Sequence, residues 1–297
     1  MKDDLKKIAK KMGFEIGIVK PRIFKELEKI LVYRKAVGLE NEFEKKEIEE
    51  KINPFYTMKD CKSIIVAIFP YYSKEMENGN LSKYCKVLDY HYIIKDLFLD
   101  YVKKIEMKYY NFDYKMFIDN GPLIDRYLGY KSGLGFFGLN NSLINDEYGS
   151  YIFIGYMLTD LDLQEDISLD KKCIQCKKCI KYCPGNALKE ENDSDYNRCA
   201  SYLTQKKGYL KDFEKDIINK SKKIFGCDIC QDICFHNQNI KETDIRAFKE
   251  SIKTNLSKEE LLNLSNKEFK KIYKDRAFSW RGKKVLLRNI ELIKNNL

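Results

Sequence analysis

The stretch "CIQCKKCIKYCPG", Cys173 to Gly185, holds four cysteines within eleven residues and follows the last of them with proline. The spacing is Cys-x2-Cys-x2-Cys-x3-Cys-Pro, which is the arrangement that binds [4Fe-4S] clusters in bacterial ferredoxins. The first three thiolates hold one cluster, and the fourth is a ligand of the other cluster. A zinc site usually takes its four ligands as two separated pairs. The run therefore favours an iron-sulfur protein over a zinc protein.

Four further cysteines complete the ligands of two clusters. The segment "GCDICQDIC" contains three of them, and Cys199 stands alone between the two runs. Because the last cysteine of each run crosses to the other cluster, the eight divide into two sets. Cys199 is assigned only because eight ligands are required. One set is Cys173, Cys176, Cys179 and Cys234, and the other is Cys183, Cys199, Cys227 and Cys230.

The composition restricts the class of protein. The chain has 297 residues, 44% of them hydrophobic, so it can bury a core and form two or three domains. Its N-terminus, "MKDDLKKIAKKMGF", is charged throughout, and no run of about 18 uncharged apolar residues occurs anywhere. We therefore expect no signal peptide, no membrane span and a cytoplasmic location. In that reducing compartment the clustered cysteines indicate metal, while Cys61 and Cys85 are expected to be small buried hydrophobic residues.

Helix and strand patterns alternate ahead of the cysteines. Short β-branched and aromatic stretches at 62–69, 114–119 and 150–158 predict strands, and 85–109 and 122–131 predict helices. The expected fold class is α+β. The expected parts are an N-terminal α/β catalytic domain (1–165), a ferredoxin-like two-cluster module (166–240) and a short basic helical C-terminal region (241–297).

The C-terminal region carries most of the excess positive charge. The formal net charge is +10, and residues 241–297 contain 15 Lys and Arg against 8 Asp and Glu. Two capping boxes, Ser257 with Glu260 and Ser265 with Glu268, predict short helices there. Such a tail is either a solvated surface or a binding surface for nucleic acid, and we favour the second interpretation. The candidate cations are Lys270, Lys271, Lys274, Arg276, Arg281, Lys283, Lys284 and Arg288.

Asp119 is the candidate proton donor. It ends a predicted strand in "FIDNGP", and burial can raise the pKa of such a carboxyl group towards neutrality. The spacing equally allows Asp119 to cap a helix that begins near Pro122. On that helix, Asp125 and Arg126 are expected to form an exposed pair. His91 alone would be interpreted as an ordinary core or surface histidine.

The segment "GLGFFG", Gly133 to Gly138, spells the G-x-G-x-x-G pattern of dinucleotide-binding loops. That loop should follow a strand and begin a helix, whereas a helical stretch precedes this one. Gly133 instead suits the C′ position of the preceding helix. We therefore expect no dinucleotide site here.

Taken in order, the motifs resemble epoxyqueuosine reductase, a cobalamin-dependent relative of reductive dehalogenases with two [4Fe-4S] clusters. The resemblance extends over about 85 to 240, and the tail "LSKEELLNLSNKEFKKIYKDRAFSWRGKKVLLRN" adds to it. The segments that carry it are "DYH" (89–91), "FIDNGPLIDR" (117–126), "SGLGFFGLNN" (132–141), "YGSYIFIGYMLTD" (148–160), "CIQCKKCIKYCPGNAL" (173–188), "CASYLTQKKG" (199–208) and "GCDICQDICFHN" (226–237).

This resemblance implies reduction of epoxyqueuosine to queuosine at the wobble position of transfer RNA, the last step of queuosine biosynthesis. The reductant it implies is Co(I) cobalamin loaded through the two clusters. It also implies two partners, transfer RNA carrying epoxyqueuosine and an external one-electron donor such as ferredoxin or flavodoxin. We expect a monomer that does not associate with a membrane. Two alternatives stay open at this point: a related cobalamin-dependent reductase or dehalogenase of a small molecule, and a ferredoxin-type electron carrier.

The resemblance also implies residue roles. Asp119 matches the acid that protonates the substrate, and Cys199 matches an isolated cluster ligand in "C-x-S-Y-L-T". The chain departs from the family pattern in "CFHN" and "GLNN", where C-P-x-N and G-K-N are usual, and in a C-terminal region shorter than in members with helical repeats. The residues implied to bind cobalamin are Tyr90, His91, Ser142, Leu143, Ile154, Ser201, Tyr202 and Thr204.

Overall fold

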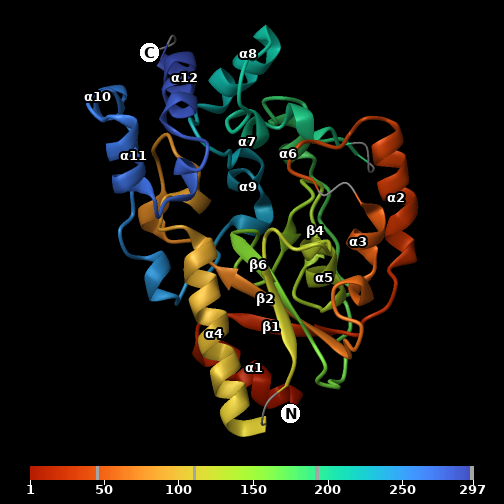
Figure 1. The fold of residues 1–297 in the computed structure, drawn as a ribbon. Helices are drawn as coiled ribbons and strands as arrows, with labels where there is room; N and C mark the ends of the chain where they lie inside the picture. The colour runs from red at the N-terminus through yellow and green to blue at the C-terminus, as the bar shows by residue number, and fades with distance from the viewer. Residues whose placement is uncertain (45–46, 110–111, 191–193, 295–297) are drawn as a thin grey trace.

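A four-stranded sheet lies at the centre of the N-terminal part (Figure 1). The computed structural model describes residues 1–44, 47–109, 112–190 and 194–294. The strand order is β1-β2-β6-β3, and each pairing is antiparallel. The strands are β1 (Glu15–Val19), β2 (Ser63–Pro70), β6 (Ile152–Thr159) and β3 (Tyr114–Ile118).

Every residue of β2 is buried, because helices cover both faces of the sheet. This double burial explains why "SIIVAIFP" is apolar at nearly every position instead of alternating with polar residues. Ile65, Ala67 and Phe69 point to one face, and the residues between them point to the other.

Different helices cover the two faces, as Figure 1 shows. One face is packed by α1 (Lys2–Lys11), α4 (Tyr90–Tyr109) and the C-terminal helices α10 (Lys258–Leu262), α11 (Asn266–Tyr273) and α12 (Lys283–Lys294). The other face is packed by α2 (Lys25–Ala36), α3 (Ile48–Ile52) and α5 (Asp125–Lys131).

The cysteine-rich segment forms short helices beyond one end of the sheet (Figure 1). They are α6 (Lys178–Lys181), α7 (Ala200–Leu203), α8 (Asp212–Ser221) and α9 (Ile229–Asp232), and a small apolar cluster including Leu203 and Ile218 lies among them. A two-stranded hairpin of β4 (Phe136–Phe137) and β5 (Leu143–Ile144) precedes the cysteine-rich segment in the sequence. Single-turn 3-10 helices occur at Pro54–Tyr56, Lys74–Met76, Lys83–Cys85, Tyr196–Arg198, Phe235–Asn237, Arg246–Phe248 and Ala277–Ser279.

The α+β class and the main expected elements are confirmed. The strands begin and end within two residues of their expected bounds, and both capping boxes of the tail are formed. Strand β1 and the β4–β5 hairpin were not expected. Helix α4 begins at Tyr90 instead of 85, because the Asp89 side chain accepts a hydrogen bond from the His91 amide at 3.0 Å and so begins the helix there.

The C-terminal region packs into the main core. Leu261, Phe269 and Leu286 belong to the same buried cluster as Leu5 and Phe98. The division into three domains therefore stays a prediction, and the last three residues of the third part lie outside the described residues. Among the described helices, none is both long and apolar enough to cross a membrane.

Candidate functional site

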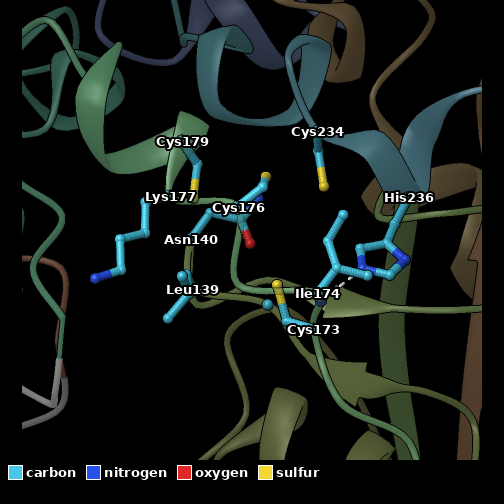
Figure 2. A pocket seen from close by; sticks show the side chains of 10 residues that line it. Leu139, Asn140, Cys173, Ile174, Cys176, Lys177, Cys179, Cys234 and His236 are labelled. Atoms are coloured by element: carbon cyan, nitrogen blue, oxygen red, sulfur yellow. Dashed lines mark hydrogen bonds between the residues drawn. The ribbon is translucent and has the colours of Figure 1, made fainter.

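Four cysteine thiols gather around one pocket at the start of the cysteine-rich segment. Cys173, Cys176, Cys179 and Cys234 line it together with the backbone turn at Gly138 to Asn140 and with His236. Figure 2 shows their four sulfur atoms around a common hollow, with Cys234 reaching it from the opposite side to Cys179. We call these four cysteines the outer group.

The local backbone explains how closely spaced residues can face one hollow. Gln175 and Lys177 both adopt left-handed conformations, with φ of 54° and 57°. Two such residues within three positions curl the chain tightly, which non-glycine residues rarely do without a structural reason. The turn places Cys173 and Cys176 beside Cys179 on α6.

The other four cysteines form a second group. The Cys230 thiol is buried, and its electrostatic neighbours are the thiols of Cys227, Cys199 and Cys183. Burial first, and then these neighbours, raise the pKa of Cys230 well above its ordinary value. The backbone amide of Ala187 donates to the Cys183 sulfur at 3.3 Å. We call Cys183, Cys199, Cys227 and Cys230 the inner group.

The outer group has electrostatic neighbours only of its own set. Burial, followed by the charges of Cys173, Cys234 and Cys176, raises the pKa of Cys179 to about 11. Thiolates held this close and this far from water need cations among them. The structure thus brings the thiols together in the two sets that the crossing rule predicted, and ligation by each of them stays a prediction.

Two groups of four thiols suit two clusters, because a [4Fe-4S] cluster is held by four cysteine thiolates. Cys61 and Cys85 are both buried away from the groups, at 6% and 0% exposure, as the sequence predicted.

Asp119 lies at the end of β3 in a left-handed conformation, with φ of 60°. Its side chain is 54% exposed, and its carboxylate accepts a hydrogen bond from the Tyr90 hydroxyl. Burial, and then the charge of Asp119, raise the pKa of Tyr90 well above its ordinary value, so this hydroxyl stays a donor. Such a backbone conformation in a non-glycine residue is typical of functional positions.

His91 connects Asp119 to a second carboxylate. Its Nδ1 lies 2.7 Å from Asp89 Oδ1, and its Nε2 lies 3.7 Å from Asp119 Oδ2. Burial disfavours the charged ring, but the hydrogen bond that the ring donates to Asp89 and the charges of both aspartates outweigh it and raise the pKa of His91. The sequence alone suggested an ordinary histidine, and only the fold places it beside the candidate acid.

The capping interpretation of Asp119 is wrong. Helix α5 begins at Asp125 after Ile124, and no side chain caps it. Asp119 is six residues from that helix start, and its carboxylate is directed to Tyr90 and His91 instead. The catalytic interpretation is therefore the one that remains as a proposal.

Tyr156 supports the loop that carries Asp119, and the sequence did not indicate this. Its hydroxyl accepts a hydrogen bond from the Leu123 amide at 3.0 Å. Gly121 lies against the same ring, so closely that an added Cβ would come within 2.2 Å of the hydroxyl oxygen. Any side chain at Gly121 would therefore move the loop.

The prediction that Asp125 and Arg126 form an exposed pair is wrong for Asp125. Arg126 is exposed and donates to the Asn141 carbonyl, whereas Asp125 Oδ1 is buried with no hydrogen-bond partner in the described structure. Burial, and then the charge of Asp119, raise the pKa of Asp125 well above its ordinary value. A protonated Asp125 beside the loop adds no second charge there.

The residues that the resemblance implied for cobalamin divide by exposure. A residue that lines a ligand must offer surface when the ligand is absent, and His91, Ser142, Ile154, Ser201 and Tyr202 do so. Tyr90 is 8% exposed. Leu143 and Thr204 are 2% and 0% exposed, and contact of these two residues with cobalamin stays a prediction. The Thr204 hydroxyl accepts a hydrogen bond from the Gly226 amide and donates one to the Ser201 carbonyl. Thr204 therefore supports Ser201, one of the residues that the resemblance implies for cobalamin.

The glycine-rich segment is no dinucleotide loop, as predicted. Gly133 follows the end of α5 with φ of 73°, and its amide donates to the Tyr130 carbonyl at 3.2 Å. This is the C′ position of a helix. The segment then leads into β4 and turns towards the outer group at Gly138.

Half of the tail cations serve the fold. Arg281 pairs with Glu42 at 2.7 Å, and Arg288 and Arg276 donate to backbone carbonyls of Lys206 and Lys86 at 2.8 and 2.9 Å. Lys283 donates to the Leu264 carbonyl. These four are therefore removed from the candidate RNA surface, because a side chain committed to the protein is not free to follow phosphates. The exposed remainder is Lys270, Lys271, Lys274 and Lys284.

Comparisons with known proteins match both parts of this site. A family model described as a 4Fe-4S double cluster binding domain matches residues 172–237, which include all eight grouped cysteines. A second model, described as epoxyqueuosine reductase QueG, matches residues 51–120, which end just after Asp119.

Similar proteins cover nearly the whole chain. An epoxyqueuosine reductase of Lactococcus garvieae is 33% identical over 98% of this chain and 85% of its own. The structure of epoxyqueuosine reductase from Streptococcus thermophilus has a TM-score of 0.88 at 32% identity and covers 99% of this chain and 80% of that one. An epoxyqueuosine reductase structure with an epoxyqueuosine-modified tRNA-Tyr stem loop has a TM-score of 0.89 at 28% identity, with 98% and 80% covered.

The crossed grouping of thiols makes a sharp prediction for Cys234. Although it belongs to the same sequence run as Cys227 and Cys230, Cys234→Ala is expected to remove the outer cluster and leave the inner one. Iron content should fall by about half, as it should for Cys179→Ala. Iron analysis with electron paramagnetic resonance of the reduced protein measures this.

Cys61→Ala is the matched control and should keep all of the iron, because Cys61 is buried outside both groups. Loss of the inner signal in Cys234→Ala, with the outer signal retained, would contradict the grouping.

The second prediction concerns His91. Its raised pKa means that the stabilisation from its charge is complete below the ordinary histidine pKa and is lost as pH rises through the raised value. Asp89→Asn should lower the pKa of His91 and move that loss to lower pH. The chain has only two histidines, so nuclear magnetic resonance of histidine-labelled protein can follow both rings. An unchanged His91 titration in Asp89→Asn would contradict the role of Asp89, and the His236 titration is the internal control.

Proposed function

This chain belongs to the epoxyqueuosine reductase family, and on that premise we propose that it reduces epoxyqueuosine to queuosine in transfer RNA. The observation that carries the proposal is Asp119, held in a left-handed turn by Tyr90 and His91, on a chain that also groups eight thiols for two clusters. An electron carrier would need the thiols but not the acid.

The reaction sets the roles that the site must fill. Removing an epoxide oxygen to leave a carbon-carbon double bond consumes two electrons and two protons and releases water. The chain carries two [4Fe-4S] clusters, each of which passes one electron at a time. One proton must reach the epoxide oxygen as its carbon-oxygen bond breaks, and Asp119 is the proposed donor.

The neighbours of Asp119 suit that role. When Asp119 has given up its proton, its carboxylate keeps a hydrogen bond from Tyr90 and lies 3.7 Å from the His91 ring. A protonated His91 stabilises the new negative charge, and Asp89 stabilises the protonated ring. Because Asp119 is partly exposed, the modified nucleobase of the substrate can approach it, and water can return its proton.

We infer that cobalamin binds between the acid loop and the cysteine-rich segment. The resemblance to cobalamin-dependent reductases supports this, and His91, Ser142, Ile154, Ser201 and Tyr202 offer the surface to hold it. Ile118 on β3 pairs with Gly155 on β6, and this antiparallel register directs Asp119 towards Ile154. The proposed acid therefore lies near one of the proposed cobalamin-binding residues. When bound, the corrinoid supplies a strong reductant to the epoxide-bearing ring. Both ring nitrogens of His91 lie within hydrogen-bonding distance of polar side chains, Nδ1 close to Asp89 and Nε2 close to Asn120.

Transfer RNA is the proposed macromolecular substrate. A similar protein has been solved with an epoxyqueuosine-modified tRNA stem loop. Here, Lys270, Lys271, Lys274 and Lys284 are exposed on the C-terminal helices and can contact phosphates. The wobble base would have to leave the anticodon stack to reach Asp119, as single-stranded bases do when proteins read them.

The decisive experiment is anaerobic reconstitution with iron, sulfide and cobalamin, followed by assay on epoxyqueuosine-containing transfer RNA. The expected product is queuosine, with about eight irons and one cobalt per chain. A protein that holds both cofactors but leaves the modified RNA unchanged would contradict the proposed function.

Asp119→Asn should retain both clusters and cobalamin but lose turnover by at least about 100-fold, because an amide has no transferable acidic proton. Single-turnover product formation measures this. Asp100→Asn is the matched control, an exposed aspartate on α4 that pairs with Lys103, and it should turn over normally. Normal turnover by Asp119→Asn would remove the catalytic role.

Replacing Lys270, Lys271 and Lys274 together by Gln should weaken transfer-RNA binding and flatten its salt dependence. Each lost phosphate contact lowers the slope of log affinity against log salt by roughly 0.7 to 0.9. Binding across a salt series measures the slope. Gln at the exposed Lys7, Lys11 and Lys104 provides a charge-matched control remote in sequence, and equal slopes for both triple variants would place RNA elsewhere.

A further inference from the structure

The outer group of thiols lies at the molecular surface. Cys176 is exposed, and the pocket of the outer group opens beside Ile174 and Lys177. In Figure 2 the Lys177 side chain extends away from the sulfur atoms, so it does not cover them. None of the four cysteines in the inner group is exposed. Electrons from outside the chain therefore meet the outer group first.

Large apolar side chains that are next to the cysteines in sequence are exposed, and one of them, Ile174, lines the pocket of the outer group. Ile174 and Phe235, which directly follow Cys173 and Cys234, are 53% and 55% exposed. Tyr182, at the end of α6, is 53% exposed as well. Exposed large apolar side chains of this kind are typical of a surface that another protein covers.

Unpaired lysines accompany the apolar residues. Six charged residues lie between 170 and 181, five of them lysines and one aspartate. Lys171 pairs with Asp146, and Lys177 pairs with Glu190. Lys172, Lys178 and Lys181 are exposed, and no described carboxylate forms an ion pair with them. The segment that carries the outer group thus exposes both apolar side chains and lysines.

We propose that this surface, Ile174, Tyr182 and Phe235 with Lys172, Lys178 and Lys181, docks a small acidic one-electron carrier protein. The proposal rests on the proposed function, which needs such a donor. Charge complementarity is the argument for this occupant: a negative protein face would meet three exposed lysines that have no described ion-pair partner, together with exposed apolar side chains. Weak electron-transfer complexes have small interfaces, so a patch of this kind is sufficient.

The electron balance is simple. Each encounter oxidises one reduced carrier by one electron and reduces the outer cluster by one electron, with no bond made or broken. Two encounters supply the two electrons that removal of one epoxide oxygen consumes. One of the two protons comes from Asp119 and the other from solvent. Asp119 is far from the docking surface in sequence and lies on a different element.

RNA is a poorer occupant of this surface than a protein. Phosphate contacts need cations that follow the backbone, and they gain little from exposed aliphatic and aromatic side chains. The free lysines of α11 are also separate from this segment in the chain. The two occupants can be distinguished by which ligand loses affinity when the lysines are changed.

The test uses the reconstituted holoprotein and flavodoxin as the acidic carrier. Lys172, Lys178 and Lys181 are replaced together by Glu, and in a milder variant by Gln. Stopped-flow absorbance follows reduction of the clusters by reduced flavodoxin, and surface plasmon resonance follows binding. Reduction by dithionite, which needs no docking, is measured in parallel, and iron analysis confirms that both clusters are present.

At low ionic strength the Glu variant should be reduced by flavodoxin roughly tenfold or more slowly, with the Gln variant in between. The difference should shrink as salt screens the charges. Dithionite reduction should be unchanged, and Glu at Lys7, Lys11 and Lys104 should leave flavodoxin reduction near normal.

Equal slowing by both triple-Glu variants would overturn the proposal, since only net charge would then matter. So would unchanged flavodoxin reduction, or a loss of transfer-RNA affinity in place of flavodoxin affinity. The dithionite-driven assay on modified RNA separates this question from the proposed function: queuosine formed with dithionite upholds the function even where docking fails, and its absence with full cofactors contradicts the function itself.

Discussion

Charge on eight partly buried thiols is the constraint on which the rest of this structure depends. Thiolates removed from water are costly unless cations lie among them, and here burial and mutual repulsion both raise the pKa of Cys179 and Cys230. Cys234, which follows α9, joins the group of Cys179 on α6, and Cys183, which follows α6, joins the group of Cys230 on α9. This crossing fixes α6 against α9, although each helix has only four residues. Helices so short gain little stability alone, so their arrangement must come from what the thiols bind.

The cysteine-rich segment is joined to the sheet by polar side chains that leave little freedom. Asp228, which lies between two cysteines of the inner group, is 1% exposed and accepts from Ser82 and from the Lys83 amide at 2.8 Å. Asn289 on α12 donates to the Thr204 and Ile224 carbonyls at 2.7 and 2.8 Å. Buried hydrogen bonds of this kind are expensive to break, because each partner would be left unsatisfied. These hydrogen bonds therefore hold the segment of the inner group against Ser82 and Lys83 and against α12.

The outer thiol group, the inner thiol group and the proposed acid occupy different places in the fold. The outer group opens at a positive, partly apolar surface, whereas the inner group has no exposed member. Asp119 lies on a loop that Tyr156 supports from beneath and that Tyr90 and His91 approach from α4.

Much of this protein could be predicted from local sequence. The cluster type follows from the spacing of the first cysteine run, since Cys173, Cys176 and Cys179 lie within seven residues. The buried strand 63–70, the capping boxes of α10 and α11 and the C′ role of Gly133 are likewise local, because each depends on neighbours within about one turn or one strand. The role of Asp119 as a helix cap was an open alternative for the same reason: spacing cannot show where a side chain points.

Only the tertiary structure decided which distant groups meet. His91 joins Asp89 to Asp119 across 28 residues of chain, and Tyr156 reaches the acid loop from the neighbouring strand. The burial of Asp125, and of the proposed cobalamin contacts Leu143 and Thr204, also depends on packing by elements far away in sequence. Spacing determines chemistry where the ligands are close along the chain. Solvent exposure and the pKa values that follow from it are properties of the surroundings, and these exist only once the chain has folded.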